Sequence, residues 1–364
     1  MQSIVDRYRF RLVRKIAEGG MGAVYEAIQH GAEGFEKIVS IKTVIEDLSS
    51  NPEFVQMFIG EAKLVADLVH QNIVQVYQLG KIGTRYYIAM EYVHGVNLEE
   101  FLERHYELGR RVPVELVAFI VSRASLGLDY AHSKTDMHGK PLGVVHRDIS
   151  PRNIMIDTQG VVKITDFGIA KAREVMAARE GEVLLGKAQY MSPEQAQLQA
   201  TDLRSDLFSL GIVMYELFAG RNIFADENTR TTIANITQHP VPPVRTYNPD
   251  VPEELERILR KALERDIERR YQSGNDFAYD LQYYMYKDRF GPTYQTLEAY
   301  LKEIFPHFAD PKVSRTLRPI SYRSLSETAV LDVQGTESPP VPPSPGQDTA
   351  GTTNSAQGRE AEPN

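Results

Sequence analysis

The spacing of hydrophobic and polar positions divides the chain into a segment of strands, a segment of helices and a polar tail. Beta-branched and aromatic residues gather in Tyr8–Ala17, Ala23–Gln29 and Ile38–Thr43, which are separated by turns that contain glycine. Two further stretches, Val74–Lys81 and Arg85–Glu91, flank a short turn and predict a hairpin. The first part of the chain is therefore expected to consist mostly of strands.

Helical spacing appears once between these strands and then dominates the rest of the folded chain. In residues 51–69 the apolar positions recur at helical intervals, so one helix is expected to interrupt the strands. Strands followed by helices predict an α+β fold with a small β-rich lobe and a larger, mainly helical lobe. The larger lobe is expected to contain the apolar helices Val114–His132 and Asp206–Phe218 and the amphipathic helices Pro252–Leu263 and Asp276–Lys287.

Composition excludes several classes of protein. The formal net charge of −8 argues against a protein that coats nucleic acid or an anionic membrane by bulk charge. The absence of cysteine excludes disulfides, thiolate metal sites and thiol catalysis. The first ten residues carry charges and few apolar side chains, unlike a signal peptide, and no apolar run is long enough to span a bilayer. A soluble, cytoplasmic chain is expected.

The last 53 residues, 312–364, have the composition of a segment that does not fold by itself. They hold 7 of the 20 prolines, and no aromatic residue follows Tyr322. Such a segment buries too little apolar surface to offset the entropy lost on ordering, so we expect a disordered Ser/Thr/Pro-rich tail.

A glycine-rich stretch between the first two strands is suited to a polyphosphate. Because glycine has no Cβ, the backbone there can approach phosphate oxygens closely. Taken alone, such a stretch is more often a softened hairpin turn than a binding site. Its residues are Ile16, Ala17, Glu18, Gly19, Gly20, Met21, Gly22, Ala23 and Val24.

A charged pair is expected between the third strand and the helix that follows it. Lys42 lies among apolar neighbours in V-S-I-K, and Glu61 lies on the apolar face of the helix predicted over 51–69. A carboxylate on a buried face is costly unless a cation meets it, and Lys42 is the nearest candidate. A surface-exposed Glu61 is the alternative.

Acidic and amide side chains follow in two later segments. Asp148 and Asn153 lie in H-R-D-I-S-P-R-N, and Asp166 begins D-F-G thirteen residues after Asn153. Two carboxylates and an amide oxygen supply one candidate general base and oxygen ligands suited to Mg²⁺. Each residue taken singly is as often a turn former, but chance does not explain all of them in this order after the glycine-rich stretch and the strand lysine.

These motifs resemble those of the eukaryotic-type (Hanks-type) bacterial serine/threonine protein kinases. The family pattern is G-x-G-x-x-G-x-V, V-A-I-K, H-R-D-x-x-x-x-N, D-F-G and A-P-E, and this chain has A-E-G-G-M-G-A-V, V-S-I-K, H-R-D-I-S-P-R-N, D-F-G and S-P-E. The resemblance covers residues 8–285 and implies a bilobal kinase domain, with the smaller lobe over about 8–92 and the larger over about 93–285. Residues 286–311 would be a helical extension.

The resemblance implies ATP and Mg²⁺ as cofactors, with Mn²⁺ as an alternative metal. Lys42, held by Glu61, would contact the α- and β-phosphates, and Asp148 would orient the acceptor hydroxyl and take its proton. The metal would be held by Asn153 and Asp166, and the glycine-rich stretch would cover the phosphates. The base and its surroundings would be contacted by Val24, Ser40 and Met155, by the gatekeeper Met90 and by the hinge residues Glu91 and Val93.

Three further residues match structural positions of the family. Asp206 would tie down the backbone of the catalytic loop. Glu194 and Arg270 would form a buried ion pair in the larger lobe.

Ser150 and Lys187 depart from the family pattern, which has lysine at the first position and threonine at the second. In the family these two groups meet beside the catalytic aspartate. We hypothesise an exchange, in which Lys187 supplies the ammonium to the γ-phosphate and Ser150 supplies the bridging hydroxyl. The alternative is a solvent-facing Lys187 in a slow enzyme.

The segment from 167 to 189 contains no Ser, Thr or Tyr. Kinases with an arginine before the catalytic aspartate, as Arg147 is here, usually order this segment by pairing the arginine with a phosphorylated hydroxyl. Glu174, Glu180 or Glu182 could serve Arg147 as a fixed anion, which predicts basal activity without phosphorylation. A segment ordered only by a partner is the alternative.

The favoured function is an ATP-dependent protein kinase that phosphorylates Ser and Thr of protein substrates and of its own chain. The retained lysine, general base and metal ligands argue against a pseudokinase scaffold, and segment 186–194 resembles the peptide-docking segment of protein kinases rather than a small-molecule phosphotransferase. Tyrosine or dual specificity is the alternative, because Ser150 replaces the lysine typical of Ser/Thr enzymes and Arg152 matches an arginine of tyrosine kinases.

The tail is a candidate substrate and a candidate ligand. Thr316, Thr328 and Ser344 are the predicted autophosphorylation positions, and Pro339–Pro343 could form a polyproline II helix, although such a run is more often a spacer. A phosphothreonine- or proline-reading domain is therefore an expected partner.

Overall fold

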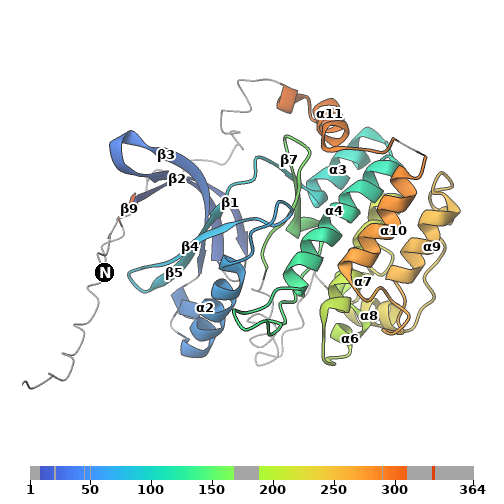
Figure 1. The fold of residues 1–364 in the computed structure, drawn as a ribbon, viewed down its shortest axis with the longest axis horizontal. Coiled ribbons are helices and arrows are strands. Elements are labelled where there is room, and N and C mark those ends of the chain that lie inside the picture. The colour runs from blue at the N-terminus through green and yellow to red at the C-terminus, as the bar shows by residue number, and fades with distance from the viewer. Residues whose placement is uncertain are drawn as a thin grey trace, which may run out of the picture. The chain divides into compact units, whose positions relative to one another are not determined.

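The computed structural model describes residues 9–19, 22–44, 46–49, 51–167, 188–288, 290–309 and 330–332. Strands come first and most helices follow, which confirms the predicted α+β organisation with a β-rich smaller lobe and a helical larger lobe (Figure 1). The predicted strands and the predicted hairpin are all present, and the helix Val114–His132 has the predicted bounds.

The smaller lobe is built on an antiparallel sheet with the strand order β4-β5-β3-β2-β1-β9. The glycine-rich stretch is the turn between its first two strands, where Gly19 and Gly22 are paired. The strands are β1 (Arg9–Gly19), β2 (Gly22–His30), β3 (Glu36–Val44), β4 (Val76–Ile82), β5 (Arg85–Glu91) and β9 (Val330–Asp332).

The two faces of this sheet bury different side chains, because successive residues of a strand point to opposite sides. In β5, Ile88 and Met90 pack on one face with Phe58 of α2 (Pro52–Ala66), whereas Tyr87 and Ala89 pack on the other face. The helix α2 therefore covers one face of the sheet (Figure 1). The short helices of this lobe are η1 (Ala32–Gly34) and α1 (Glu46–Ser49).

The larger lobe is organised around α4 and α7, two helices that are buried on nearly all sides, as their apolar sequences predict. No helix among the described residues is long and apolar enough to cross a membrane. The helices are α3 (Leu98–Leu108), α4 (Val114–His132), α6 (Pro193–Ala196), α7 (Leu203–Ala219), α8 (Thr229–Thr237), α9 (Glu253–Ala262), α10 (Gly274–Tyr286) and α11 (Tyr294–Ile304), with short η3 (Ala188–Tyr190), η4 (Val244–Thr246) and η5 (Pro306–Ala309).

A second, three-stranded sheet carries the loops that matter for function, and sequence patterning did not predict it. Its strands β6 (Gly95–Asn97), β7 (Ile154–Asp157) and β8 (Val162–Ile164) are too short to show a clear alternation. The turn η2 (Pro151–Asn153) precedes β7. Backbone hydrogen bonds from Val74 N to Ile164 O at 2.8 Å and from Ile164 N to Asn72 O at 2.9 Å join this sheet to the segment before β4.

The helix α11 lies within the extension expected at 286–311 and packs on α3. His105 is buried, with Nε2 2.8 Å from the Tyr300 hydroxyl and Nδ1 2.7 Å from Phe101 O. Arg104 Nε donates to Ile304 O at 2.7 Å. The extension is therefore anchored to the larger lobe by buried polar contacts as well as by apolar ones.

The tail expected at 312–364 contributes β9, which pairs with β1 through Phe10 and Leu331. These three residues are ordered as a strand, so disorder does not extend to them. The rest of the predicted tail lies outside the described residues.

Candidate active site

Lys42 and Asp166 meet although 124 positions separate them in the chain. Lys42 Nζ lies 2.6 Å from Asp166 Oδ1, and the two side chains are 17% and 28% exposed. The pairing of β3 with β2 sets Lys42 opposite Val24, and β8 leads into Asp166. The two residues predicted to hold phosphate and metal thus face the same point between the lobes.

The side chain of Glu61 lies outside the described residues, although its backbone belongs to α2. The ion pair between Glu61 and Lys42 therefore stays a prediction. Lys42 is reached by the carboxylate of Asp166 instead of being exposed to solvent.

The catalytic loop is held in shape by Asn153. Its Nδ2 donates to Asp148 O at 2.7 Å, and its carbonyl accepts from Thr165 N at 2.9 Å. Asn153 thus connects the loop that carries Asp148 to the residue before Asp166. With its amide nitrogen engaged, its side-chain oxygen is the atom suited to a cation.

Asp206 fixes the backbone before Asp148, as predicted. Its carboxylate accepts from His146 N and Arg147 N, both at 2.7 Å, and lies 2.8 Å from His132 Nε2. Burial alone would raise the pKa of Asp206, but the hydrogen bond and charge of His132 and the His146 amide hold it below its usual range. Arg147 has a φ of 62°, a left-handed conformation that is costly for a side-chain-bearing residue and that these bonds maintain.

His146 joins the catalytic loop to the D-F-G segment. Its Nδ1 accepts from Asp148 N at 3.2 Å and its Nε2 lies 2.9 Å from Thr165 O, which assigns the proton to Nε2. Its ring packs edge-on against Phe167, with centroids 4.6 Å apart. His146 therefore supports the loop that carries Asp148 by packing and by hydrogen bonds.

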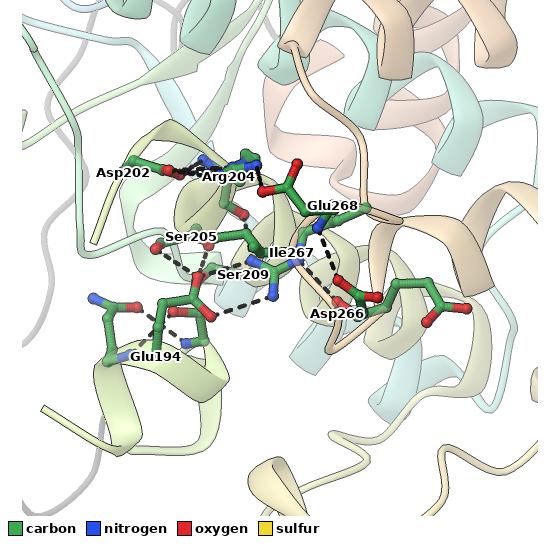
Figure 2. A network of polar contacts seen from close by, with 12 residues as sticks. Glu194, Asp202, Arg204, Ser205, Ser209, Asp266, Ile267 and Glu268 are labelled. Atoms are coloured by element: carbon green, nitrogen blue, oxygen red, sulfur yellow. Dashed lines mark hydrogen bonds and ion pairs between the residues drawn. The ribbon is translucent and has the colours of Figure 1, made fainter. Parts of the chain in front are cut away.

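The buried ion pair of the larger lobe is also present. Arg270, whose side chain is fully buried, contacts Glu194 at 2.8 and 3.2 Å, and Ser205 Oγ donates to the same carboxylate at 2.6 Å. Figure 2 shows this network, in which Glu194 of α6 points toward Ser205 of α7. Burial would raise the pKa of Glu194, but the hydrogen bonds from Arg270 and Ser205 lower it.

The segment around α6 is tied to the catalytic loop and to α7. Gln195 Nε2 donates to Arg147 O at 3.0 Å, and the Tyr190 hydroxyl donates to Glu216 at 2.7 Å. Burial raises the pKa of Glu216, the carboxyl group that accepts this hydrogen bond. The segment predicted to dock peptides is therefore tied to the loop that carries Asp148, the predicted general base, and to α7.

Several of the predicted adenine contacts are brought together around Met90. Ser40 and Met90 are directly opposite in the pairing of β3 with β5, and Val24 and Val93 pack against the apolar cluster that contains Met90. Met155 lies on β7 in the second sheet. A cavity of about 30 Å³ adjoins Met90, and Lys42, Asp166, Phe58 and Phe167 are among its other lining residues.

Gly22 is required by the geometry of the glycine-rich turn. Its φ is 155°, and a Cβ added there would lie 1.7 Å from Thr43 O. Only glycine allows β2 and β3 to approach each other this closely at the start of the pairing. Gly20 and Met21 at the tip of the turn lie outside the described residues.

The predicted exchange between Ser150 and Lys187 is not tested by the structure. Ser150 is buried, and its Oγ has no hydrogen-bond partner in the part of the chain that the structure describes. Lys187 lies outside that part, as do Glu174, Glu180 and Glu182. Among the described residues, Arg147 Nε donates to Thr201 Oγ1 at 3.2 Å.

Sequence reasoning missed the contacts that fix the hinge. Lys163 of β8 contacts Glu91 at 2.9 Å, and Glu91 N donates to Gln75 O at 2.8 Å. The partners are far apart in the chain, and a lysine in a short strand gives no sign that it is paired. Only the apolar neighbours of Lys163 could have suggested that it needs a buried partner.

Comparisons with known proteins agree with this geometry. The family model described as protein kinase domain matches residues 10–278. The tyrosine-protein kinase MasK of Myxococcus xanthus is 40% identical over 322 residues, which cover 87% of this chain and 49% of that protein. The serine/threonine-protein kinase PrkC of Bacillus subtilis is 35% identical over 274 residues, covering 75% of this chain and 40% of that protein.

Another curated relative and a solved structure extend the comparison. The serine/threonine-protein kinase PknA of Mycobacterium tuberculosis is 35% identical over 275 residues, covering 74% of this chain and 60% of that protein. The crystal structure of the PknI kinase domain of the same species matches with a TM-score of 0.58 at 25% identity, covering 78% of this chain and 98% of that one. The chain spans about two fifths to three fifths of the length of these curated relatives.

Proposed function

The chain belongs to the protein kinase family, and we propose that it transfers the γ-phosphoryl group of ATP to Ser and Thr hydroxyls of proteins, including its own. The contact that carries the proposal is the one between Lys42 and Asp166, 2.6 Å long, next to the loop that Asn153 and Asp206 hold in place. A candidate cation for phosphate thus meets a candidate metal ligand, and a backbone bond from Thr165 to Asn153 joins them to the loop that carries the candidate base Asp148. The Ser/Thr kinases among the relatives support the same function.

The residues present fit ATP and a hard divalent metal. Lys42 offers an ammonium group to phosphate oxygens, and Asp166 and Asn153 offer a carboxylate and an amide oxygen, which are ligands that Mg²⁺ prefers. When bound, Mg²⁺, or Mn²⁺ as the alternative, would offset negative charge on the phosphates. Lys42 would then exchange its contact with Asp166 for the phosphate, with Glu61 as the predicted second partner.

Asp148 would act on the acceptor. It would accept a hydrogen bond from the acceptor hydroxyl and take its proton, while that oxygen bonds to the γ-phosphorus and the bond from phosphorus to the β-phosphate oxygen breaks. The loop bonds from Asn153 and His146 fix the backbone of Asp148, which carries the carboxylate. Gln195 joins this loop to the docking segment, which positions a peptide relative to the base.

Tyrosine is the second candidate acceptor, and two observations favour it. The relative that is 40% identical is named a tyrosine-protein kinase. In this chain Ser150 stands where Ser/Thr kinases carry lysine, and Arg152 Nε contacts both carboxylate oxygens of Glu99, at 2.7 and 2.9 Å. The loop after Asp148 therefore carries an arginine, Arg152, but no long cationic side chain at Ser150.

One experiment separates these functions. The chain is incubated with Mg²⁺ and labelled ATP, with and without peptides that present Ser, Thr or Tyr, and the phosphorylated residues are identified by mass spectrometry. The expected result is label on Ser and Thr that is lost in Asp148→Asn. Label on tyrosine alone would establish the second candidate, and no label with retained nucleotide binding would indicate a pseudokinase scaffold.

The wider role of the protein stays a prediction at several points. The substrates of the whole protein, its cytoplasmic location and a phosphothreonine- or proline-reading partner at the tail are supported only by the sequence. Mapping the tail in the same experiment tests whether Thr316, Thr328 and Ser344 are phosphorylated.

A further inference from the structure

A buried carboxylate in the glycine-loop hairpin contacts the hinge through one arginine. Glu26 of β2 is 1% exposed, although no predicted nucleotide or metal contact involves it. Its Oε2 accepts from Arg14 Nε at 2.8 Å, and Arg14 Nη2 donates to the Tyr92 hydroxyl at 3.1 Å. Residues of β1, β2 and the hinge therefore meet in one polar contact, here called the flap clamp (Arg14, Glu26 and Tyr92).

The clamp lies on the same face of the hairpin as Val24, a predicted adenine contact. Val24 and Glu26 are two positions apart on β2, so their side chains lie on the same face of the sheet. Val24 packs against the apolar cluster that contains Met90, the predicted gatekeeper. Glu26 is thus on the same side as the predicted adenine contact but nearer to the hinge.

The hairpin needs such a contact because its backbone pairing is irregular at this point. Arg14 and Glu26 are directly opposite in the pairing of β1 with β2. The register shifts on both sides of them, between Leu12 and Arg14 and again between Lys15 and Ala17. Bulges interrupt the ladder and bend the strand, so side-chain contacts there have more influence on where the hairpin tip lies.

The other end of the clamp is firmly held. Tyr92 follows Glu91, which contacts Lys163 of the second sheet at 2.9 Å. Two residues further on, His94 O accepts from Thr158 N at 2.8 Å. The larger lobe therefore fixes the hinge on both sides of Tyr92, and the clamp attaches the hairpin to this fixed segment.

Burial and charge make the three side chains depend on one another. A carboxylate as deeply buried as Glu26 is costly without a cation, and Arg14 is the cation that meets it. Burial is the main cause that raises the pKa of Tyr92, and the negative charge of Glu26 is the second. The Tyr92 hydroxyl therefore stays protonated and neutral. The planar guanidinium group of Arg14 contacts Glu26 and Tyr92 at the same time. The single ammonium group of a lysine does not offer two donors in this fixed geometry.

We propose that Arg14, Glu26 and Tyr92 are positioning residues that hold the glycine-rich turn at a set distance from the hinge and thereby set the affinity for ATP. They act through the hairpin and contact neither the reacting phosphate nor the acceptor. The inference rests on the proposed function, because it assumes that the cleft binds a nucleotide.

Direct binding measurements test the clamp. Calorimetric titration of the full chain with a non-hydrolysable ATP analogue and Mg²⁺ gives Kd for wild type, Tyr92→Phe and Arg14→Lys. Losing a hydrogen bond to a charged group lowers the fraction of molecules with a correctly placed hairpin, so Kd should rise about three- to tenfold in both variants. Glu36→Gln, which breaks the exposed contact with His30 at 3.1 Å in the same sheet, is the matched control and should leave Kd unchanged.

Kinetics distinguish positioning from a general structural role. In Tyr92→Phe, KM for ATP should rise by the same factor as Kd, while kcat and KM for a peptide acceptor stay within about twofold. Because Glu26 and Tyr92 act through Arg14, the double variant Glu26→Gln with Tyr92→Phe should lose little more than Glu26→Gln alone.

Equal Kd values in wild type, Tyr92→Phe and Arg14→Lys would overturn the clamp, as would a fall in kcat with unchanged Kd. A wild-type chain that binds the analogue but transfers no phosphate would refute the proposed function and leave the clamp measurable. A wild-type chain that binds no analogue would refute both.

Discussion

The substitution Asp206→Asn tests whether the catalytic loop is held by one buried carboxylate. Asp206 is 1% exposed. Its carboxylate accepts hydrogen bonds from two backbone amides at 2.7 Å and lies 2.8 Å from His132 Nε2. Asparagine keeps the shape of the side chain, but its amide nitrogen cannot accept a hydrogen bond. At least one buried donor therefore loses its partner.

The magnitude follows from that loss. Each buried donor left without a partner costs about 1–3 kcal/mol, and His132 also loses the negative charge beside it. A decrease of about 2–5 kcal/mol in the free energy of unfolding is expected. Without these bonds Arg147 can leave its left-handed conformation, which displaces Asp148, so kcat should fall about 100-fold while the Kd for nucleotide stays near the wild-type value.

Urea denaturation and phosphate transfer are measured on Asp206→Asn and on the matched control Asp202→Asn. Asp202 is the N-cap of the same helix, α7, and its side chain is about half exposed, so the control should cost less than about 1 kcal/mol. Because the pKa of Asp206 is lowered in the folded protein, the stability it contributes is present above about pH 4 and is lost as the pH falls further. Equal losses in the two variants, or an unchanged kcat in Asp206→Asn, would refute this reasoning.

Two further predictions concern buried ionisable side chains of the larger lobe. Glu194→Gln leaves Arg270 without its carboxylate, so urea denaturation should show a loss of about 3–5 kcal/mol, and a loss below about 1 kcal/mol would contradict the buried pair. Burial lowers the pKa of His105, so its neutral form is favoured in the folded protein and stability should decline as the pH falls below about 6.5. His105→Phe should therefore reduce the drop in Tm between pH 7.5 and 5.5, and an unchanged drop would show that other groups cause it.

Much of the fold could be predicted because it depends on periodic burial. The helix α4 begins and ends at the predicted residues, and β1, β2, β3 and the hairpin of β4 and β5 lie where their residue types and the turns between them indicated. The helix α4 buries most of its residues, and the strands are long enough for their residue types to identify them. The strands β6, β7 and β8 bury only a few residues each, and their short sequences contain too little pattern to be identified.

The sequence by itself determined which chemical groups are available. Glycines between the first two strands, a strand lysine, and the carboxylates and amide of two loops matched the motifs of a kinase family. Through that resemblance they predicted phosphate transfer before any contact was known. It also predicted the pair of Glu194 with Arg270 and the attachment of the catalytic loop to Asp206, through resemblance to a family with the same motifs.

The tertiary structure alone decided which distant groups meet. Glu26 and Tyr92 both contact Arg14, and Lys163 contacts Glu91, across 72 positions in the second case. Such partners leave no trace in local spacing, because a buried charge can be satisfied by any group that folding brings within hydrogen-bond distance. The residue types set which chemical groups the site can use. The packing of the chain sets which of these groups contact the hinge and the hairpin of β1 and β2.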